Sequence, residues 1–169
     1  TDEPPEGTVR HENYAVPLSA ETVIREDENS GSFQNGSYEL RRTAHYRGGI
    51  TGLKEPFYMT SGQKEARFYV RTPSSVAGEF KFLTLVVLQN GIPIAYQQFT
   101  GDDFRLYPNQ SVVINYPFTT DQNQMLDVMV LWDGNYDVVI DKIEFTNVGE
   151  NTQEDYYIDL EQKGSLKGI

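Results

Sequence analysis

Short runs in which apolar and polar residues alternate recur along this chain, and they constrain its fold more than any other feature. In 66–71, Ala66, Phe68 and Val70 alternate with charged or polar neighbours. A period of two places every second side chain on one face of a β-strand. Further candidate strands occupy 80–88, 92–99, 111–116, 125–132 and 136–145. Residues typical of turns separate them and helical periodicity does not persist, so the sequence predicts an all-β fold, a two-sheet antiparallel sandwich of the jelly-roll type.

Two turns are predicted between these strands. Asn90-Gly91 lies between two apolar runs and is the strongest short hairpin signal in the chain. Pro93 follows this turn. Because proline has no N–H to donate, either the next strand lies at a sheet edge or Pro93 stands at the start of that strand. Asp133-Gly134 or Gly134-Asn135 predicts a second tight turn that pairs 125–132 with 136–145.

The 169 residues are most simply one domain with polar ends. Residues 1–13 are acidic and contain prolines, as a linker does, and the opening TDEPPEG indicates a piece of a longer polypeptide. The sandwich is expected over 14–148. Residues 149–169 are predicted to be a polar extension or linker, in which YYIDL (156–160) adds an edge strand or belongs to a following module.

Charge and composition exclude several classes of function. The formal net charge is −11 and there is no dense run of lysine or arginine, which argues against binding to nucleic acid or to anionic membranes. No apolar run is long enough to span a membrane. The absence of cysteine excludes disulfides, thiolate zinc sites and thiol catalysis.

Three segments together resemble a known family: GSYELRRTAHYRGG (36–49), PFYMTSGQKEARFYVRT (56–72) and VMVLWDGNYDVVIDKIEF (128–145). They are similar to the galactose-binding-domain-like β-sandwich of carbohydrate-binding modules, especially families 4, 9 and 22. The resemblance covers roughly 32–147. It implies a non-catalytic domain that binds a polysaccharide or oligosaccharide and belongs to a larger secreted or cell-surface protein.

The motifs of that family fall on specific residues here. Arg42-Thr43 matches its Arg-Thr, Tyr46 stands where tryptophan is usual, and Gly48 or Gly49 matches the glycine that follows. Tyr69-Val70-Arg71 matches a strand end. Asp133 falls near an acid that contacts sugar in some members, and Asp141 matches the first aspartate of the closing strand, while Lys142 replaces a frequent second acid.

A sugar-binding site needs a flat ring for the apolar face of the sugar and planar polar groups for its hydroxyls. The candidate rings are Tyr46, Trp132 and Tyr136. The candidate polar groups are Arg42, Arg47, Asp133, Asn135 and Gln97. Trp132 has an alternative interpretation, because it shares a strand face with Leu126, Val128 and Val130 and could belong to the core. The acidic surface and the modest number of contacts predict weak binding to a neutral glycan.

Asp141 lies between apolar residues of a strand, where an unpaired buried carboxylate is costly. The resemblance implies a structural calcium beside this strand, shared with an acid near the first strand. Glu21 is the best candidate for that second ligand and Glu26 the alternative. Asp141 could instead point outward and be solvated.

Signals for catalysis are few. The chain has two histidines, His11 and His45, which is too few for a zinc site. No nucleophile motif or phosphate-binding motif is present. We therefore expect no enzymatic activity and a carbohydrate-binding module. A spacer or adhesion domain of a surface protein without a sugar site is the alternative, and a small jelly-roll hydrolase or lyase is a third hypothesis.

Overall fold

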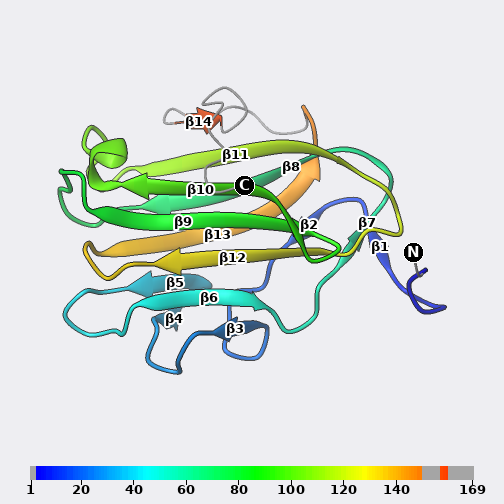
Figure 1. The fold of residues 1–169 in the computed structure, drawn as a ribbon, viewed down its shortest axis with the longest axis horizontal. Helices are drawn as coiled ribbons and strands as arrows, with labels where there is room; N and C mark the ends of the chain where they lie inside the picture. The colour runs from blue at the N-terminus through cyan, green and yellow to red at the C-terminus, as the bar shows by residue number, and fades with distance from the viewer. Residues whose placement is uncertain (1–2, 150–156, 160–169) are drawn as a thin grey trace.

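The computed structural model describes residues 3–149 and 157–159, which form a β-sandwich of two main sheets (Figure 1). The smaller sheet has five strands in the order β10 (Ile92–Thr100), β9 (Lys81–Gln89), β12 (Leu126–Trp132), β6 (Gly48–Leu53) and β3 (Val23–Arg25). Its neighbours are all antiparallel. The predicted fold class is confirmed.

The larger sheet has seven strands, one of which pairs off the main path. Its order is β14 (Tyr157–Asp159), β11 (Ser111–Thr120), β8 (Gly62–Arg71), β13 (Val138–Asn147), β5 (Ser37–Leu40) and β4 (Ser32–Gln34), with β2 (Tyr14–Ala15) paired to β13. Only β14 runs parallel to its neighbour within this sheet, at its edge, as one of the two hypotheses for YYIDL predicts. The described part of the chain contains one short 3₁₀ helix, η1 (Gly101–Phe104), and no helix long and apolar enough to cross a membrane.

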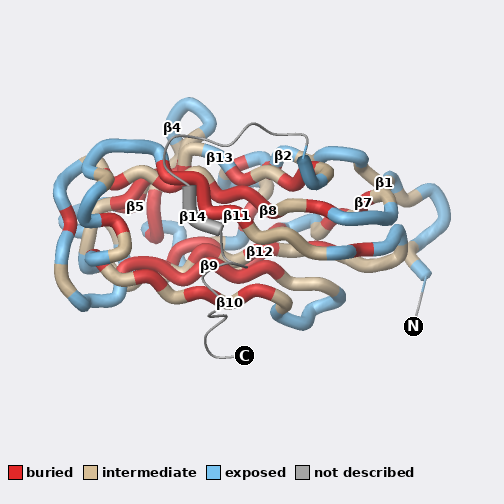
Figure 2. The backbone as a smooth tube through the Cα atoms, turned by 90° about the horizontal axis from the view of Figure 1, so that it is seen from above, coloured by how far each residue is buried: buried red, intermediate tan, exposed pale blue. Residues whose placement is uncertain are grey.

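Alternation builds the core between the sheets. Along β12, Leu126, Val128, Val130 and Trp132 are buried and the residues between them are half-buried. In Figure 2 the buried residues line the interior between the two layers. Burial of these side chains is the main stabilising term of such a sandwich.

The folded part begins before residue 14. β1 (Arg10–His11) pairs with β7 (Tyr58–Met59). The buried ammonium of Lys64 donates to the backbone oxygen of Glu12 and, at 2.6 Å, to Asn147 Oδ1. The predicted linker therefore extends at most to residue 9. The C-terminal segment 149–169 lies mostly outside the described residues.

The hairpin at Asn90-Gly91 is confirmed, with φ of 53° and 78° at the two turn residues. β10, which carries Pro93, is an edge strand as predicted. The hairpin predicted at 133–135 is wrong, because β12 lies in the smaller sheet and β13 in the larger one. Gly134 does have a positive φ of 82°, but the turn serves a connection between the sheets.

Candidate functional site: a groove at one end of the sandwich

Three connections meet at one end of the sandwich, at the left of Figure 1: 41–47 between β5 and β6, 72–80 between β8 and β9, and 133–137 between β12 and β13. Two adjacent hollows lie among them, both open to solvent. One of about 240 Å³ is lined by Arg42, Thr43, Ser74, Ser75, Val76, Tyr136 and Asp137. The other, of about 380 Å³, is lined by Arg42, Ala77, Phe80, Gly134, Asn135 and Tyr136. Because Arg42 and Tyr136 line both, we treat the hollows as one groove.

Trp132, in the core, supports the connection 133–137 through a hydrogen bond. The indole N–H donates to the backbone oxygen of Tyr136 at 2.8 Å, and the Tyr136 hydroxyl donates to the backbone oxygen of Ala77 at 2.6 Å. The Tyr136 ring also packs edge-on against Phe82, with ring centroids 5.8 Å apart. These contacts fix Tyr136 in the wall of the groove.

The connection 41–47 is tied to the same wall. The Arg42 backbone N–H donates to Asp137 Oδ1 at 2.8 Å, and the Arg41 N–H donates to His45 Nδ1, also at 2.8 Å. Partial burial lowers the pKa of His45, which keeps the imidazole neutral and able to accept this bond. The guanidinium of Arg42 takes no part in these bonds and remains available at the groove.

Two aromatic rings are exposed at this end of the molecule. Phe80 is 70% exposed and lines the larger hollow, whereas Tyr46 is 62% exposed and lines neither. The exposed ring of Phe80 at the groove is available to stack on a ligand. Phe80 was missed in the sequence because it was assigned to the strand that follows. Phe80, Lys81 and Phe82 continue the alternation of that strand, so the sequence carried no signal that Phe80 is exposed.

The predicted site residues are therefore only partly brought together. Arg42, Tyr136 and Asn135 line the groove. Asp133 and Arg47 line neither hollow, although a Cβ on the lining residue Gly134 would lie 3.4 Å from Arg47 Cβ. Burial raises the pKa of Asp133, and the positive charges of Lys81 and Arg47 partly offset this effect.

Two predicted ligand contacts are wrong. Trp132 is 2% exposed and belongs to the core, because its strand face points between the sheets. Its contribution to the groove is indirect, through Tyr136. Gln97 is fully buried in β10, where its amide N–H donates to the backbone oxygen of Gln98.

The two acids predicted to share calcium are not brought together either. Asp141 Oδ1 and Oδ2 each lie 3.2 Å from a guanidinium nitrogen of Arg71, and Ser37 Oγ is 3.4 Å from Oδ1. A bulge in β13 between Ile140 and Lys142 makes Asp141 the extra residue, so it does not point into the core. Glu21 precedes β3 of the other sheet and lines a different hollow, and the alternative ligand Glu26 is exposed. In the described ranges no group of three or more acidic or histidine side chains could hold a metal ion.

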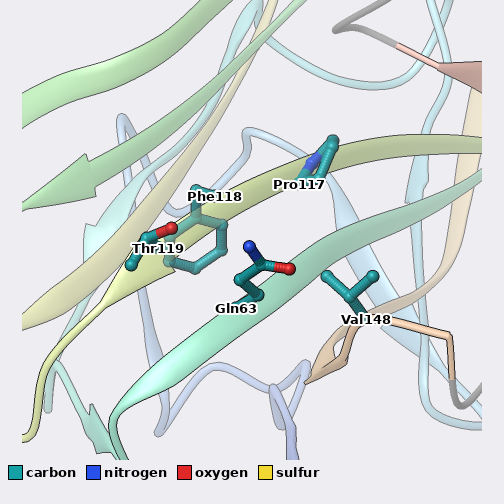
Figure 3. A pocket seen from close by; sticks show the side chains of 5 residues that line it. All are labelled: Gln63, Pro117, Phe118, Thr119 and Val148. Carbon is teal, nitrogen blue, oxygen red and sulfur yellow. The ribbon is translucent and has the colours of Figure 1, made fainter.

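Other hollows are less suited to a ligand. Figure 3 shows the one on β8 and β11, of about 290 Å³, which is lined by Gln63, Pro117, Phe118, Thr119 and Val148. It has no charged lining residue, and the Phe118 ring packs edge-on against Phe145 of the core. A hollow of about 210 Å³ lies among 14–22 and 53–55, where Tyr14 stacks on Phe57.

Comparison with known proteins gives matches among solved structures only. No family model matches the sequence, and no curated protein matches it. The CBM36-1 domain of a multidomain xylanase from the hindgut metagenome of Trinervitermes trinervoides is 14% identical, with a TM-score of 0.48 over 81% of this chain and 98% of that one. CBM35 from Paenibacillus barcinonensis is 15% identical, with a TM-score of 0.44 over 79% and 97%. The CBM22-1 xylan-binding domain of Xyn10C from the same organism is 17% identical, with a TM-score of 0.41 over 86% and 91%.

Proposed function

We propose that this domain is a non-catalytic carbohydrate-binding module whose site is the groove at the loop end of the sandwich. The observation that carries the proposal is the exposed ring of Phe80 at a groove whose other lining residues include Arg42, Asn135 and Tyr136. A phenyl ring covers the apolar face of a sugar, and guanidinium, amide and carboxylate groups pair with its hydroxyls. The sequence resemblance to carbohydrate-binding modules supports the same function.

A neutral glycan fits the charges of the groove. The Arg42 guanidinium can donate hydrogen bonds to a glycan and carries one positive charge. The Asp137 carboxylate can accept hydrogen bonds from a glycan and carries one negative charge. The two charges offset each other, and a sugar with neighbouring hydroxyls can use both groups. An anionic glycan would meet Asp137 and the excess of acidic residues in the chain.

The groove has little that supports hydrolysis. A glycosidase generally needs two carboxylates on either side of the scissile bond. Asp137 is the one carboxylate among the described residues that line either hollow, and its Oδ1 already accepts the Arg42 N–H. A binding role therefore fits the groove better than a catalytic one.

The proposal includes the setting of the domain. We infer that it belongs to a larger multidomain chain at the cell surface or outside the cell, where it attaches that chain to a polysaccharide. A structural calcium remains a prediction that rests on the sequence resemblance alone. Asp141 pairs with Arg71, and Glu21 lines a different hollow, so these two acids do not form a shared site.

The test is titration by isothermal calorimetry with soluble xylan, mannan, β-glucan and galactan. We expect weak binding, micromolar to millimolar, to at least one of them. Phe80→Ala should weaken binding at least tenfold, because a buried ring–sugar contact is lost. Leu106→Ala is the matched control, since Leu106 is 73% exposed at the same end and lines neither hollow.

The second candidate is a spacer or adhesion domain without a sugar site. A domain that ignores every glycan tested, with Phe80→Ala as stable as the wild type, would favour that function. The exposed rings of Phe80 and Tyr46 argue against it, because a spacer has no need to expose them.

A further inference from the structure

We propose that the groove contains two subsites of different chemistry, so that its smallest specific ligand is a disaccharide unit of a neutral glycan. This inference rests on the proposed function. It follows from the two hollows, which share Arg42 and Tyr136 but differ in every other lining residue. The hollows measure about 240 and 380 Å³ and lie side by side, which gives the groove two places for neighbouring sugar units.

The larger hollow carries the exposed ring of Phe80, and we call it the apolar subsite after that ring. Phe80 and Ala77 provide apolar surface, and Gly134 adds no side chain to the lining. Asn135 is the one amide of its lining. The Asn135 amide N–H donates to the Lys81 backbone oxygen at 2.8 Å, which orients its Oδ1 as the remaining acceptor. One stacked sugar unit with few hydrogen bonds suits this subsite.

The smaller hollow is a polar subsite. Its lining includes the hydroxyls of Thr43, Ser74 and Ser75, the guanidinium of Arg42 and the carboxylate of Asp137. Ser74 and Ser75 are exposed, and no hydrogen bond engages their hydroxyls within the described part of the chain. This hollow has no exposed aromatic ring. A sugar unit here would be held mainly by hydrogen bonds, which are weak singly but specific for the positions of the hydroxyls.

The wall between the subsites is rigid. Tyr136 is fixed by its hydrogen bonds to Trp132 and Ala77, and the Arg42 backbone is fixed to Asp137. Gly101 leaves space for the Tyr136 hydroxyl, since a Cβ on Gly101 would lie 2.7 Å from that oxygen. The separation of the two subsites is therefore set before the ligand binds, and so is the spacing of the two sugar units that fit.

This arrangement predicts a dependence of affinity on chain length. A monosaccharide should bind mainly at the apolar subsite, where it stacks on Phe80, and a disaccharide gains the hydrogen bonds of the polar one. A third unit gains little, because it would lie beyond the residues that line the two hollows. Each hydrogen bond of ordinary strength is worth about fivefold in affinity.

The experiment titrates the domain, uniformly labelled with ¹⁵N, with the mono-, di- and trisaccharides of β-1,4-linked xylose, glucose and mannose, monitored by amide chemical shifts. We expect the monosaccharide to shift the amides near Ala77 and Asn135, and the disaccharide to shift those of 74–76 as well. Affinity should rise at least fivefold from one unit to two and less than twofold from two to three.

Two variants separate the subsites. Phe80→Ala should weaken every ligand, and the double variant Ser74→Ala with Ser75→Ala should reduce the gain of the second unit. Ser111→Ala, at an exposed position outside both hollows, is the matched control.

The outcomes distinguish the two proposals. Absence of binding by every sugar and polysaccharide overturns the proposed function. Binding in which the monosaccharide is as tight as the disaccharide, or in which the Ser74 and Ser75 variant keeps the full gain, overturns the two subsites but leaves the carbohydrate site in place. A steady gain beyond the third unit also overturns them, because it requires a longer site.

Discussion

Trp132 shows how the role of a residue depends on what lies around it. The single tryptophan stands beside a turn, which fits a ligand platform, yet its ring is 2% exposed and its indole N–H supports the Tyr136 backbone. Its position at the end of an alternating strand face was the signal for the core. The same residue thus positions the groove without touching the ligand.

The fluorescence of Trp132 checks this assignment. We expect a blue-shifted emission that is shielded from acrylamide, because the ring is surrounded by apolar side chains. Trp132→Phe should lower the free energy of unfolding by about 1–3 kcal/mol, through the lost hydrogen bond and the smaller ring. Emission near that of free tryptophan, or strong quenching by a sugar, would contradict the buried position.

Asp127 on β12 gives a pH-dependent prediction. Burial raises the pKa of its carboxyl, and the N–H groups of Leu53 and Val128, both 2.8 Å from Oδ1, offset this only in part. With a raised folded-state pKa, the folded protein takes up the proton before the unfolded chain as the pH falls. The stability cost is therefore present at neutral pH and disappears below the ordinary aspartate pKa.

Asp127→Asn keeps an oxygen acceptor without the charge. At pH 7 the variant should equal or exceed the wild type in stability, by up to about 1 kcal/mol. The difference should shrink as the pH falls through the acid range, measured by urea unfolding at several pH values. A variant that is much less stable at pH 7 and recovers at no pH would show that the carboxylate charge itself is needed.

The two glycines that flank β10 have different roles, one in stability and one in the shape of the groove. Gly91 has a φ of 78° in the hairpin turn, and a Cβ there would meet nothing within 4 Å. Gly101 has no need of a positive φ, but a Cβ there would meet the Tyr136 ring and hydroxyl. The first glycine therefore serves the backbone and the second serves the groove.

Gly91→Ala should lower the free energy of unfolding by about 1 kcal/mol and leave sugar binding unchanged. Gly101→Ala should displace Tyr136 and weaken sugar binding severalfold. Thermal unfolding and calorimetric titration of both variants test the pair. Equal effects of the two substitutions on binding would mean that Tyr136 does not shape the groove.

Calcium is a question for the whole molecule, because any ion that binds only the folded state raises the melting temperature by mass action. Asp141 is paired with Arg71, and both side chains are partly exposed, at 28% and 32%. Asp141→Ala should therefore lower stability by about 1 kcal/mol or less, through the lost ion pair.

The measurement is the melting temperature of the wild type and Asp141→Ala, with added calcium and with a chelator. We expect the substitution to lower both melting temperatures by the same amount. A calcium response that is present in the wild type and absent in the variant would instead assign Asp141 to a metal. A wild type that is indifferent to calcium and chelator would remove the calcium prediction.

The candidate site was only partly predictable from the sequence. Arg42, Asn135 and Tyr136 stand in polar, turn-rich segments, where exposure is expected, and they do line the groove. Phe80 resembles the start of a strand, and Ser74 and Ser75 resemble any loop. Nothing local says that the segment 72–80 faces 133–137, since that proximity comes from the packing of two sheets.

The sequence by itself determined the β-strands, the hairpin at Asn90-Gly91 and the edge position of the strand that contains Pro93. These features depend on alternation, on the conformational freedom of turn residues and on the missing N–H of proline, all of which are local. Only the tertiary structure decided that the chain passes from one sheet to the other after Trp132, and that the bulge at Asp141 directs its carboxylate to Arg71. An alternating pattern fixes which side chains of a strand face inward, but it does not fix which strand lies beside it. The partners are chosen by long-range packing of the core, and the groove forms where those partners bring their loops together.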